Sequence, residues 1–257
     1  MGLPDDAVRH EIDDGEVYVV GDAVEVLAEY RDEAAAVFLD DAWARPGRVQ
    51  QDGLAYDLHP FDEHHAADGD VDETLTTAEI IDAARDALVD GGWLVADADD
   101  WLFPRFVEYL RTEWGDAAAS PDRGGFRKLG GVTYLTEDGA PDRGTHGDHL
   151  TTGGYTVLFA HDGPTDRRTD VSARQVARWP ERTYGRGGRA KPIGPYEAWI
   201  DGLVDEGELL LVPCAGTAPA ALAARRVFGD DARYVCVDVQ PEAYEGFRER
   251  YAEEFGE

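Results

Sequence analysis

The C-terminal part of this 257-residue chain holds the pattern that most constrains its fold. The apolar run Leu209–Pro213 leads into the small-residue turn Cys214-Ala-Gly-Thr-Ala, and a helix-forming run follows. A second apolar run, at residues 234–238, ends at Asp238. This is the layout of a nucleotide-binding βαβ unit, in which a tight turn lets the backbone approach the ligand and an acid accepts the ribose hydroxyls. Because most of the chain precedes this unit, the sequence predicts a circularly permuted α/β domain.

Apolar runs alternate with helix-forming segments along the rest of the chain. We expect strands at residues 17–20, 35–39, 93–96, 126–136 and 155–160. We expect helices at residues 23–30, 77–89, 103–114 and 193–204, and from Pro241 onward. This alternation predicts an α/β fold with a mostly parallel sheet and helices on both faces. The segments at 126–136 and 155–160 are expected to be antiparallel neighbours at one edge.

The organisation is expected to be a single domain over residues 1–257, because no repeat and no linker divides it. Within it we distinguish a first part at 1–163, an arginine-rich segment at 164–190 and a second part at 191–257. Residues 46–73 are polar and are expected to form a loop.

The chain is strongly acidic, with 54 acidic against 24 basic residues and a net charge of −30. Acids occur in every segment, and Lys128 and Lys191 are the only lysines. We interpret this as a solvated acidic surface adapted to a salt-rich cytoplasm; the alternative is a surface for a basic partner. In molar salt the Debye length is about 3 Å, so the acidity does not exclude nucleic acid.

Several classes of protein are disfavoured by the sequence. No signal peptide and no apolar run of membrane-spanning length is present, so a cytoplasmic protein without a membrane partner is expected. Cys214 and Cys236 lie in apolar runs and are expected to be reduced core residues. No metal site is expected. His59, His64 and His65 could form one with the neighbouring acids, but an acidic, flexible loop is the preferred interpretation. His146 and His149 lack a ligand spacing typical of a metal site.

The arginine-rich segment departs from the overall charge. Between Pro164 and Lys191, eight basic residues face three acids, a local charge of +5, with Trp179 and Tyr184 among them. Arginines interleaved with aromatics suit phosphate binding and base stacking. The alternative is pairing of these arginines with neighbouring acids. The candidate DNA-binding residues are Arg167, Arg168, Arg174, Arg178, Arg182, Arg186 and Arg189.

Several segments, taken in chain order, resemble the motifs of one enzyme family. Val19-Val-Gly-Asp-Ala-Val-Glu-Val-Leu and Ala36-Val-Phe-Leu-Asp-Asp-Ala-Trp resemble a Gly-Asp-x-x-x-x-Leu segment and the (Asp/Asn/Ser)-Pro-Pro-(Tyr/Phe/Trp) tetrapeptide after it. Ala190-Lys-Pro-Ile is similar to a Gln-Lys-Pro-Val helix start, and Val212-Pro-Cys-Ala-Gly-Thr-Ala to Asp-Pro-Phe-x-Gly-Ser-Gly. The order resembles the beta group of S-adenosylmethionine-dependent DNA amino-methyltransferases, of haloarchaeal or halophilic-virus type, in which the catalytic half precedes the cofactor half.

This resemblance implies a permuted Rossmann-like methyltransferase fold, S-adenosylmethionine as cofactor, and DNA as partner, with a homodimer left open. The reaction implied is methyl transfer to an exocyclic amine of a base, as in restriction-modification systems. Adenine N6 is favoured over cytosine N4, because the tetrapeptide begins with an acid. The catalytic residues implied are Asp40, Asp41, Ala42 and Trp43. Asp40 would orient the amine, and Trp43 would stack on a flipped base.

The resemblance also implies the cofactor-binding residues. Asp238 would hold the ribose, Asp22 would contact the adenine, and the turn around Gly216 would let the backbone approach the methionine end. The full set is Asp22, Lys191, Pro192, Pro213, Cys214, Ala215, Gly216, Thr217 and Asp238.

Two rival functions stay open at the level of sequence. The tetrapeptide lacks both family prolines, and the turn has Val212 in place of the leading acid and Ala218 in place of the second glycine. These departures suggest a non-catalytic homologue that binds DNA or a partner. The other alternative is a methyltransferase that acts on RNA or a small molecule.

Overall fold

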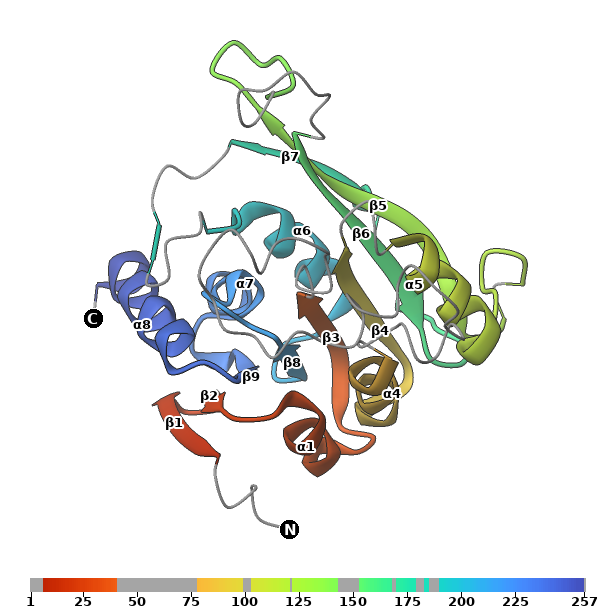
Figure 1. The fold of residues 1–257 in the computed structure, drawn as a ribbon, viewed down its shortest axis with the longest axis horizontal. Helices are drawn as coiled ribbons and strands as arrows, with labels where there is room; N and C mark the ends of the chain where they lie inside the picture. The colour runs from red at the N-terminus through yellow and green to blue at the C-terminus, as the bar shows by residue number, and fades with distance from the viewer. Residues whose placement is uncertain are drawn as a thin grey trace, which may run out of the picture.

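The structure is a computed structural model that describes residues 7–40, 78–98, 103–120, 122–142, 153–167, 170–178, 183–184 and 190–256. In these residues the chain forms one nine-stranded sheet with helices on both faces (Figure 1). The predicted α/β, Rossmann-like architecture is confirmed. No helix in the described ranges is both long and apolar enough to span a bilayer.

The strands and helices follow the predicted alternation. The strands are β1 (Val8–Asp13), β2 (Glu16–Val20), β3 (Ala34–Asp40), β4 (Leu88–Ala98), β5 (Gly125–Leu135), β6 (Gly154–His161), β7 (Arg174–Arg178), β8 (Leu209–Pro213) and β9 (Arg233–Asp238). The helices are α1 (Ala23–Leu27), α4 (Ala78–Ala87), α5 (Phe103–Tyr109), α6 (Gly194–Leu203), α7 (Pro219–Phe228) and α8 (Pro241–Phe255). Short 3-10 turns follow α1 and α7, and a π-helical turn at Leu110–Trp114 extends α5.

The sheet order is β1-β2-β9-β8-β3-β4-β6-β5-β7. Strands β2, β9, β8, β3 and β4 are parallel to one another, whereas β1 and β6 run in the opposite direction. The chain passes from β3 to β4 on one side of the centre, and from β8 to β9 on the other. The strand order therefore reverses between β3 and β8, and ligands of open α/β sheets bind at the carboxyl ends of the strands at such a point.

Each central strand is buried on both faces, which explains its continuous apolar sequence. On one face, Phe38 and Val95 pack with α6, α7 and α8. On the other face, Val37 and Leu39 pack with α1, α4 and α5. Figure 1 shows these two groups of helices on opposite sides of the strands.

Two edge strands were not predicted from the sequence. Strand β1 forms a hairpin with β2 across Asp14-Gly15, and Gly15 has the positive φ of 79° that such a turn requires. Strand β7 lies inside the arginine-rich segment and pairs in parallel with β5. The antiparallel pair β5–β6 is confirmed, but β7 lies outside it and forms the edge.

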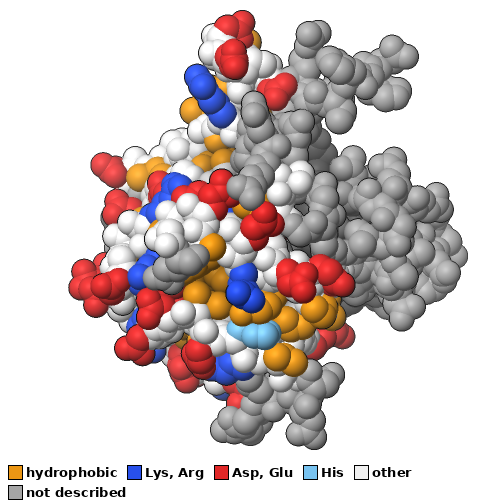
Figure 2. All heavy atoms as spheres, turned by 90° about the vertical axis from the view of Figure 1, so that its left-hand side faces the viewer, with side chains coloured by type: hydrophobic (Ala, Val, Ile, Leu, Met, Phe, Trp, Pro, Cys, Tyr) orange, Lys and Arg blue, Asp and Glu red, His pale blue; other side chains and the backbone are white. Residues whose placement is uncertain are grey.

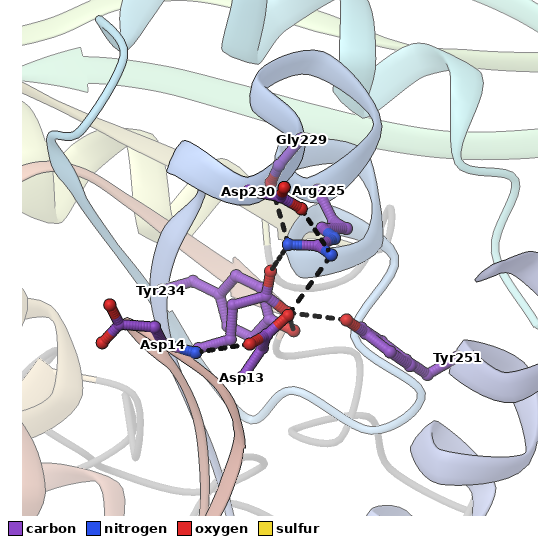
Figure 3. Close-up of polar contacts among 8 residues, drawn as sticks. Asp13, Asp14, Arg225, Gly229, Asp230, Tyr234 and Tyr251 are labelled. Carbon is purple, nitrogen blue, oxygen red and sulfur yellow. Dashed lines mark hydrogen bonds and ion pairs between the residues drawn. The ribbon is translucent and has the colours of Figure 1, made fainter. Parts of the chain in front are cut away.

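A buried ionic network ties the amino ends of β2 and β9 to α7 and α8 (Figure 3). The fully buried Glu16 carboxylate accepts hydrogen bonds from Arg225, Tyr234 and Tyr251 at 3.0, 2.7 and 3.0 Å. Burial raises the pKa of Glu16, and these donors oppose that shift. Arg225 also pairs with Asp13 and Asp230. The network lies at the amino ends of these strands, away from the carboxyl ends where ligands of such sheets bind. We therefore interpret it as a support for the fold.

The surface toward α8 and β1 carries acidic side chains spread over most of its area, with fewer basic ones among them (Figure 2). A small apolar patch also lies on this face. The scattered acids there match a solvated surface better than one concentrated docking patch.

Candidate functional site

A pocket lies at the carboxyl ends of β3, β4 and β8, where the strand order reverses. Its lining leaves about 230 Å³ of space when the open solvent at its mouth is counted, so the enclosed part is small. Three polar side chains line it, Asp40, Asp97 and Tyr196. The remaining wall is apolar and includes Phe38, Val95, Val212, Ala215, Pro219 and Ala220. An apolar pocket with a few convergent polar groups is the usual form of a ligand site.

The carboxylates of Asp40 and Asp97 share one cation. Asp40 ends β3, and it is the register partner of Asp97 on the adjacent parallel strand β4. The Nζ atom of Lys191 lies 2.7 Å from Asp40 Oδ1 and 2.7 Å from Asp97 Oδ2. Because two carboxylates flank one ammonium, the cluster keeps a net negative charge when all three groups are ionised.

The surroundings fix the ionisation of this cluster. Burial raises the pKa of Asp97, and the charge of Lys191 opposes that shift. Burial alone would lower the pKa of Lys191, but the two carboxylates outweigh it and raise that pKa. Tyr196 donates a 2.5 Å hydrogen bond to Asp97 Oδ2, and the Lys191 ammonium lies 4.7 Å from the ring centre of Tyr155. Lys191 therefore stays protonated at neutral pH.

The turn after β8 has an unusual backbone. Cys214, Gly216 and Ala218 all have positive φ, at 54°, 52° and 46°. Such values are rare for residues other than glycine, and strained backbone is often found at functional sites. A Cβ placed on Gly216 would meet nothing within 4 Å, so the space in front of this residue is open. The turn thus leaves room for a ligand to approach the backbone.

Asp238 joins this turn to the end of β9. Its carboxylate accepts the Gly216 N–H at 2.9 Å and the Gln240 N–H at 3.0 Å. The next residue, Val239, is 67% exposed, although it follows a buried strand. An acid beside an exposed apolar side chain suits a nucleoside, which offers ribose hydroxyls and an apolar ring face.

Asp22 lies near Asp238 but has a structural contact of its own. Strands β2 and β9 end side by side, and the Gly21 N–H donates to the Asp238 carbonyl at 3.0 Å. The Asp22 carboxylate caps α1 by accepting from the N–H groups of Val24 and Glu25. The structure thus brings Asp22 to the predicted region, with its side chain engaged at the helix start.

The buried side chain of Arg250 connects Lys191 to the turn. Its guanidinium donates to the Lys191 carbonyl at 2.7 Å and to Thr217 Oγ1 at 3.2 Å. Lys191 and Pro192 lead directly into α6, which has Ile193 as its N-cap and begins at Gly194, close to the expected start at residue 193. The predicted cofactor residues from 191–192 and 213–217 therefore lie around one turn.

The described arginines of the arginine-rich segment differ in their contacts. Arg167 makes a two-point ion pair with Glu208, the pairing that the sequence left as the alternative. Arg174 and Arg178 are exposed on β7, on either side of Val176, which is 63% exposed. The remaining predicted arginines, Arg168, Arg182, Arg186 and Arg189, lie outside the described residues.

Other predicted site residues also fall outside the described part. They are Asp41, Ala42 and Trp43, along with the histidines of the loop predicted at 46–73. Where the structure describes the chain, no group of three or more His, Cys, Asp or Glu side chains could hold a metal ion.

Two residues of the pocket, Asp97 and Tyr196, were missed from the sequence. A signal for Asp97 was present, because residues 93–97 form an apolar run that ends in an acid, as residues 36–40 do. Tyr196 had no such signal, since an aromatic residue in an apolar helix normally indicates core.

No protein-family model matches the sequence, and a comparison with curated proteins finds no match. Many solved structures are similar in fold, and three of them serve as examples. M1.HpyAVI in complex with SAM has a TM-score of 0.59 and 11% identity, over 91% of this chain and 98% of that one. TTHA0409 of Thermus thermophilus is named as a proposed DNA modification methylase and is complexed with S-adenosyl-L-methionine. It has a TM-score of 0.61 and 19% identity, over 92% of this chain and 93% of that one.

The PvuII DNA methyltransferase, named as cytosine-N4-specific, gives a TM-score of 0.63 and 12% identity, over 93% of this chain and 90% of that one. Each likeness spans nearly the whole of both chains. This chain therefore has the Rossmann-like fold of these methyltransferase structures.

Proposed function

We propose that this protein transfers a methyl group from S-adenosylmethionine to an exocyclic amine of a base in DNA. The observation that carries the proposal is the position of Asp40. It ends the central strand β3 and lines a pocket whose far wall is formed by the turn after β8 and the start of α7. An amine acceptor and a nucleotide-binding turn thus face the same small space.

The residues around the turn fit S-adenosylmethionine, which two of the similar structures contain. Asp238 would accept the ribose hydroxyls, Val239 would cover the adenine ring, and the open face of Gly216 would admit the methionine part. A carboxylate at the end of β9, beside the Gly216 turn, is the type of acceptor that ribose hydroxyls require. When bound, the cofactor supplies an electrophilic methyl group.

The chain's own residues would orient the target. A carboxylate at Asp40 accepts an N–H of the exocyclic amine, which directs the nitrogen lone pair away from the carboxylate and toward the methyl group. Trp43 is proposed to stack on the flipped base. Because the acceptor is an aspartate, adenine N6 is the proposed target and cytosine N4 the alternative.

DNA is proposed to contact the exposed edge strand β7. Arg174 and Arg178 extend from the same face of this strand, in a chain that is otherwise acidic. Arginines bind phosphate oxygens without reading sequence, so they would position the duplex and not select the site. Arg167 contributes less to this surface, since Glu208 already binds its guanidinium.

The test is transfer of labelled methyl from S-adenosylmethionine to unmethylated DNA in multimolar KCl, with Asp40→Ala as the matched variant. We expect label in DNA from the parent protein and none from the variant. Digestion to nucleosides then identifies the methylated base. Parallel reactions with RNA and without nucleic acid test the other substrate classes.

A non-catalytic homologue is the second candidate, because Lys191 binds the Asp40 carboxylate that the amine would need. Folded protein that binds cofactor and DNA yet transfers no label would support this candidate and overturn the proposal.

A further inference from the structure

The pocket is lined by a second carboxylate, one oxygen of which has no hydrogen-bond partner among the described residues. Asp97 is 3% exposed and lines the pocket together with Asp40. Its Oδ2 atom accepts a hydrogen bond from Tyr196 and forms an ion pair with Lys191. Its Oδ1 atom is buried and has no hydrogen-bond partner among the residues that the structure describes. A buried carboxylate oxygen without a donor is costly, so a ligand that supplies an N–H or O–H is favoured there.

The charge of the pocket indicates which kind of group fits. Asp40 and Asp97 carry two negative charges when ionised, and Lys191 neutralises one of them. The apolar remainder of the wall strengthens the field of the residual charge. A cationic group, or an amine that becomes cationic as it reacts, suits this environment better than a carbonyl or a phosphate.

On the basis of the methyltransferase function above, we propose that Asp97 is a catalytic residue that accepts the second N–H of the target amine. Asp40 accepts the first. An exocyclic amine has two N–H groups, so two acceptors orient its lone pair fully. In this chain Lys191 and Tyr196 are positioning residues, because both bind Oδ2 and leave Oδ1 without a donor among the described residues.

The same oxygen is placed to complete the reaction. The nitrogen lone pair forms the N–C bond to the methyl carbon, and the C–S bond breaks with its electron pair left on sulfur. The methylated nitrogen then carries a positive charge and loses one proton, which Asp97 Oδ1 accepts before releasing it to solvent. Burial raises the pKa of Asp97, so its ionised carboxylate takes up a proton more readily than an exposed one would.

Asp97→Asn tests the role without changing the size of the side chain. It removes the charge, and we expect kcat for DNA methylation to fall by about 100-fold or more while KM for S-adenosylmethionine changes by less than about threefold. Asp201→Asn, at an exposed position of α6, is the control. If Asp97→Asn keeps the parental kcat, the inference about Asp97 is overturned. The proposed function would still stand in that case, because the parent protein is active.

A binding measurement provides a readout that does not depend on turnover. Sinefungin carries an amine in place of the methylsulfonium group, whereas S-adenosylhomocysteine has a neutral thioether there. In calorimetric titrations, we expect Asp97→Asn to weaken the binding of sinefungin by about tenfold or more. The binding of S-adenosylhomocysteine should weaken by less than about twofold. Equal losses for both ligands would indicate a structural role and overturn the inference.

Failure of the proposed function would look different from failure of this inference. If the parent protein transfers no methyl group and binds neither ligand, the methyltransferase proposal fails, and with it the role of Asp97. Tyr196→Phe, which removes one donor to Oδ2 and keeps the ring, is expected to lower kcat less than Asp97→Asn does.

Discussion

Asp40 and Asp97 are register partners at the ends of two adjacent parallel strands, and one lysine ammonium lies 2.7 Å from a carboxylate oxygen of each. Parallel neighbours in register point their side chains to the same face of the sheet. The two acids are therefore brought together by the sheet itself, and Lys191 stabilises two charges that would otherwise repel. The arrangement makes the cluster sensitive to the loss of that single cation.

Lys191→Met is expected to move the acid limb of the pH–rate profile to higher pH. The charge of Lys191 lowers the pKa of Asp97 against the effect of burial, so its removal raises that pKa. As the pH is lowered, Asp97 in the variant is protonated at a higher pH than in the parent. Activity that needs the ionised carboxylate is therefore lost at a higher pH. Initial rates of methyl transfer between about pH 5 and about pH 9 measure the shift.

The control for that profile is Lys191→Arg, which keeps the charge and should leave the acid limb near its original position. Tyr196, Tyr155, Tyr134 and Asp40 also face the cluster, but the tyrosines stay neutral over this range because burial raises their pKa values. An unchanged limb in Lys191→Met would contradict the prediction.

Asp238→Ala is expected to weaken S-adenosylmethionine binding by about 100-fold, equivalent to about 3 kcal/mol for hydrogen bonds to a charged acceptor. Calorimetric titration measures the affinity. Asp231→Ala, in the exposed 3-10 turn before β9, should bind as the parent does. Because Asp238 also accepts the Gly216 N–H, thermal unfolding must show that the variant is folded. Parental affinity in a folded variant would place the ribose elsewhere.

Replacing Arg174 and Arg178 with alanine is expected to reduce DNA affinity about equally for all sequences. Each lost phosphate contact should lower the slope of log K against log salt concentration by about 0.9. Fluorescence anisotropy with a labelled duplex at several KCl concentrations measures the slope. Arg31→Ala, just before the central strand β3 and paired with Asp86, is the control. A slope that stays the same would remove β7 from the proposed DNA surface.

Arg225→Met is expected to destabilise the fold by about 3–5 kcal/mol, because it leaves the buried Glu16 carboxylate without its cation. Denaturant unfolding measures the change. Arg31→Met removes an exposed ion pair and should cost less than about 1 kcal/mol. The double variant Glu16→Leu with Arg225→Met should regain part of the loss, since no charge then remains buried. Similar losses of unfolding free energy in Arg225→Met and Arg31→Met would contradict the prediction that the buried ion pair contributes more stability than the exposed one.

Salt is expected to stabilise the folded protein. With a net charge of −30, repulsion between acids opposes folding, and raising KCl from about 0.2 M to about 2 M screens it. Thermal unfolding followed by circular dichroism should give a higher Tm at each step. Potassium and sodium chloride should act alike if screening is the cause. A Tm that is independent of salt would contradict the interpretation of the acidic surface.

Much of the fold could be predicted because burial leaves a local signature. The central strands are covered on both faces, so residues 35–39 and 209–213 are continuously apolar. The turn at Cys214–218 and the acid at Asp238 were also recognisable, because small residues and an acid stand at fixed places after such strands. The edge strands were missed for the opposite reason: β1 and β7 are half exposed, and their polar sequence resembles a loop.

The contacts of the candidate site required the tertiary structure. Asp97 and Lys191 are 94 residues apart, and nothing near either one indicates the other. Arg167 and Glu208 are separated by 41 residues, and their ion pair decides whether that arginine can reach DNA. Sequence by itself determined which segments become strands and helices and which acids end them, because local pattern reports local burial. Only the tertiary structure decided which charged groups meet, because that depends on the order and register of strands distant in the chain.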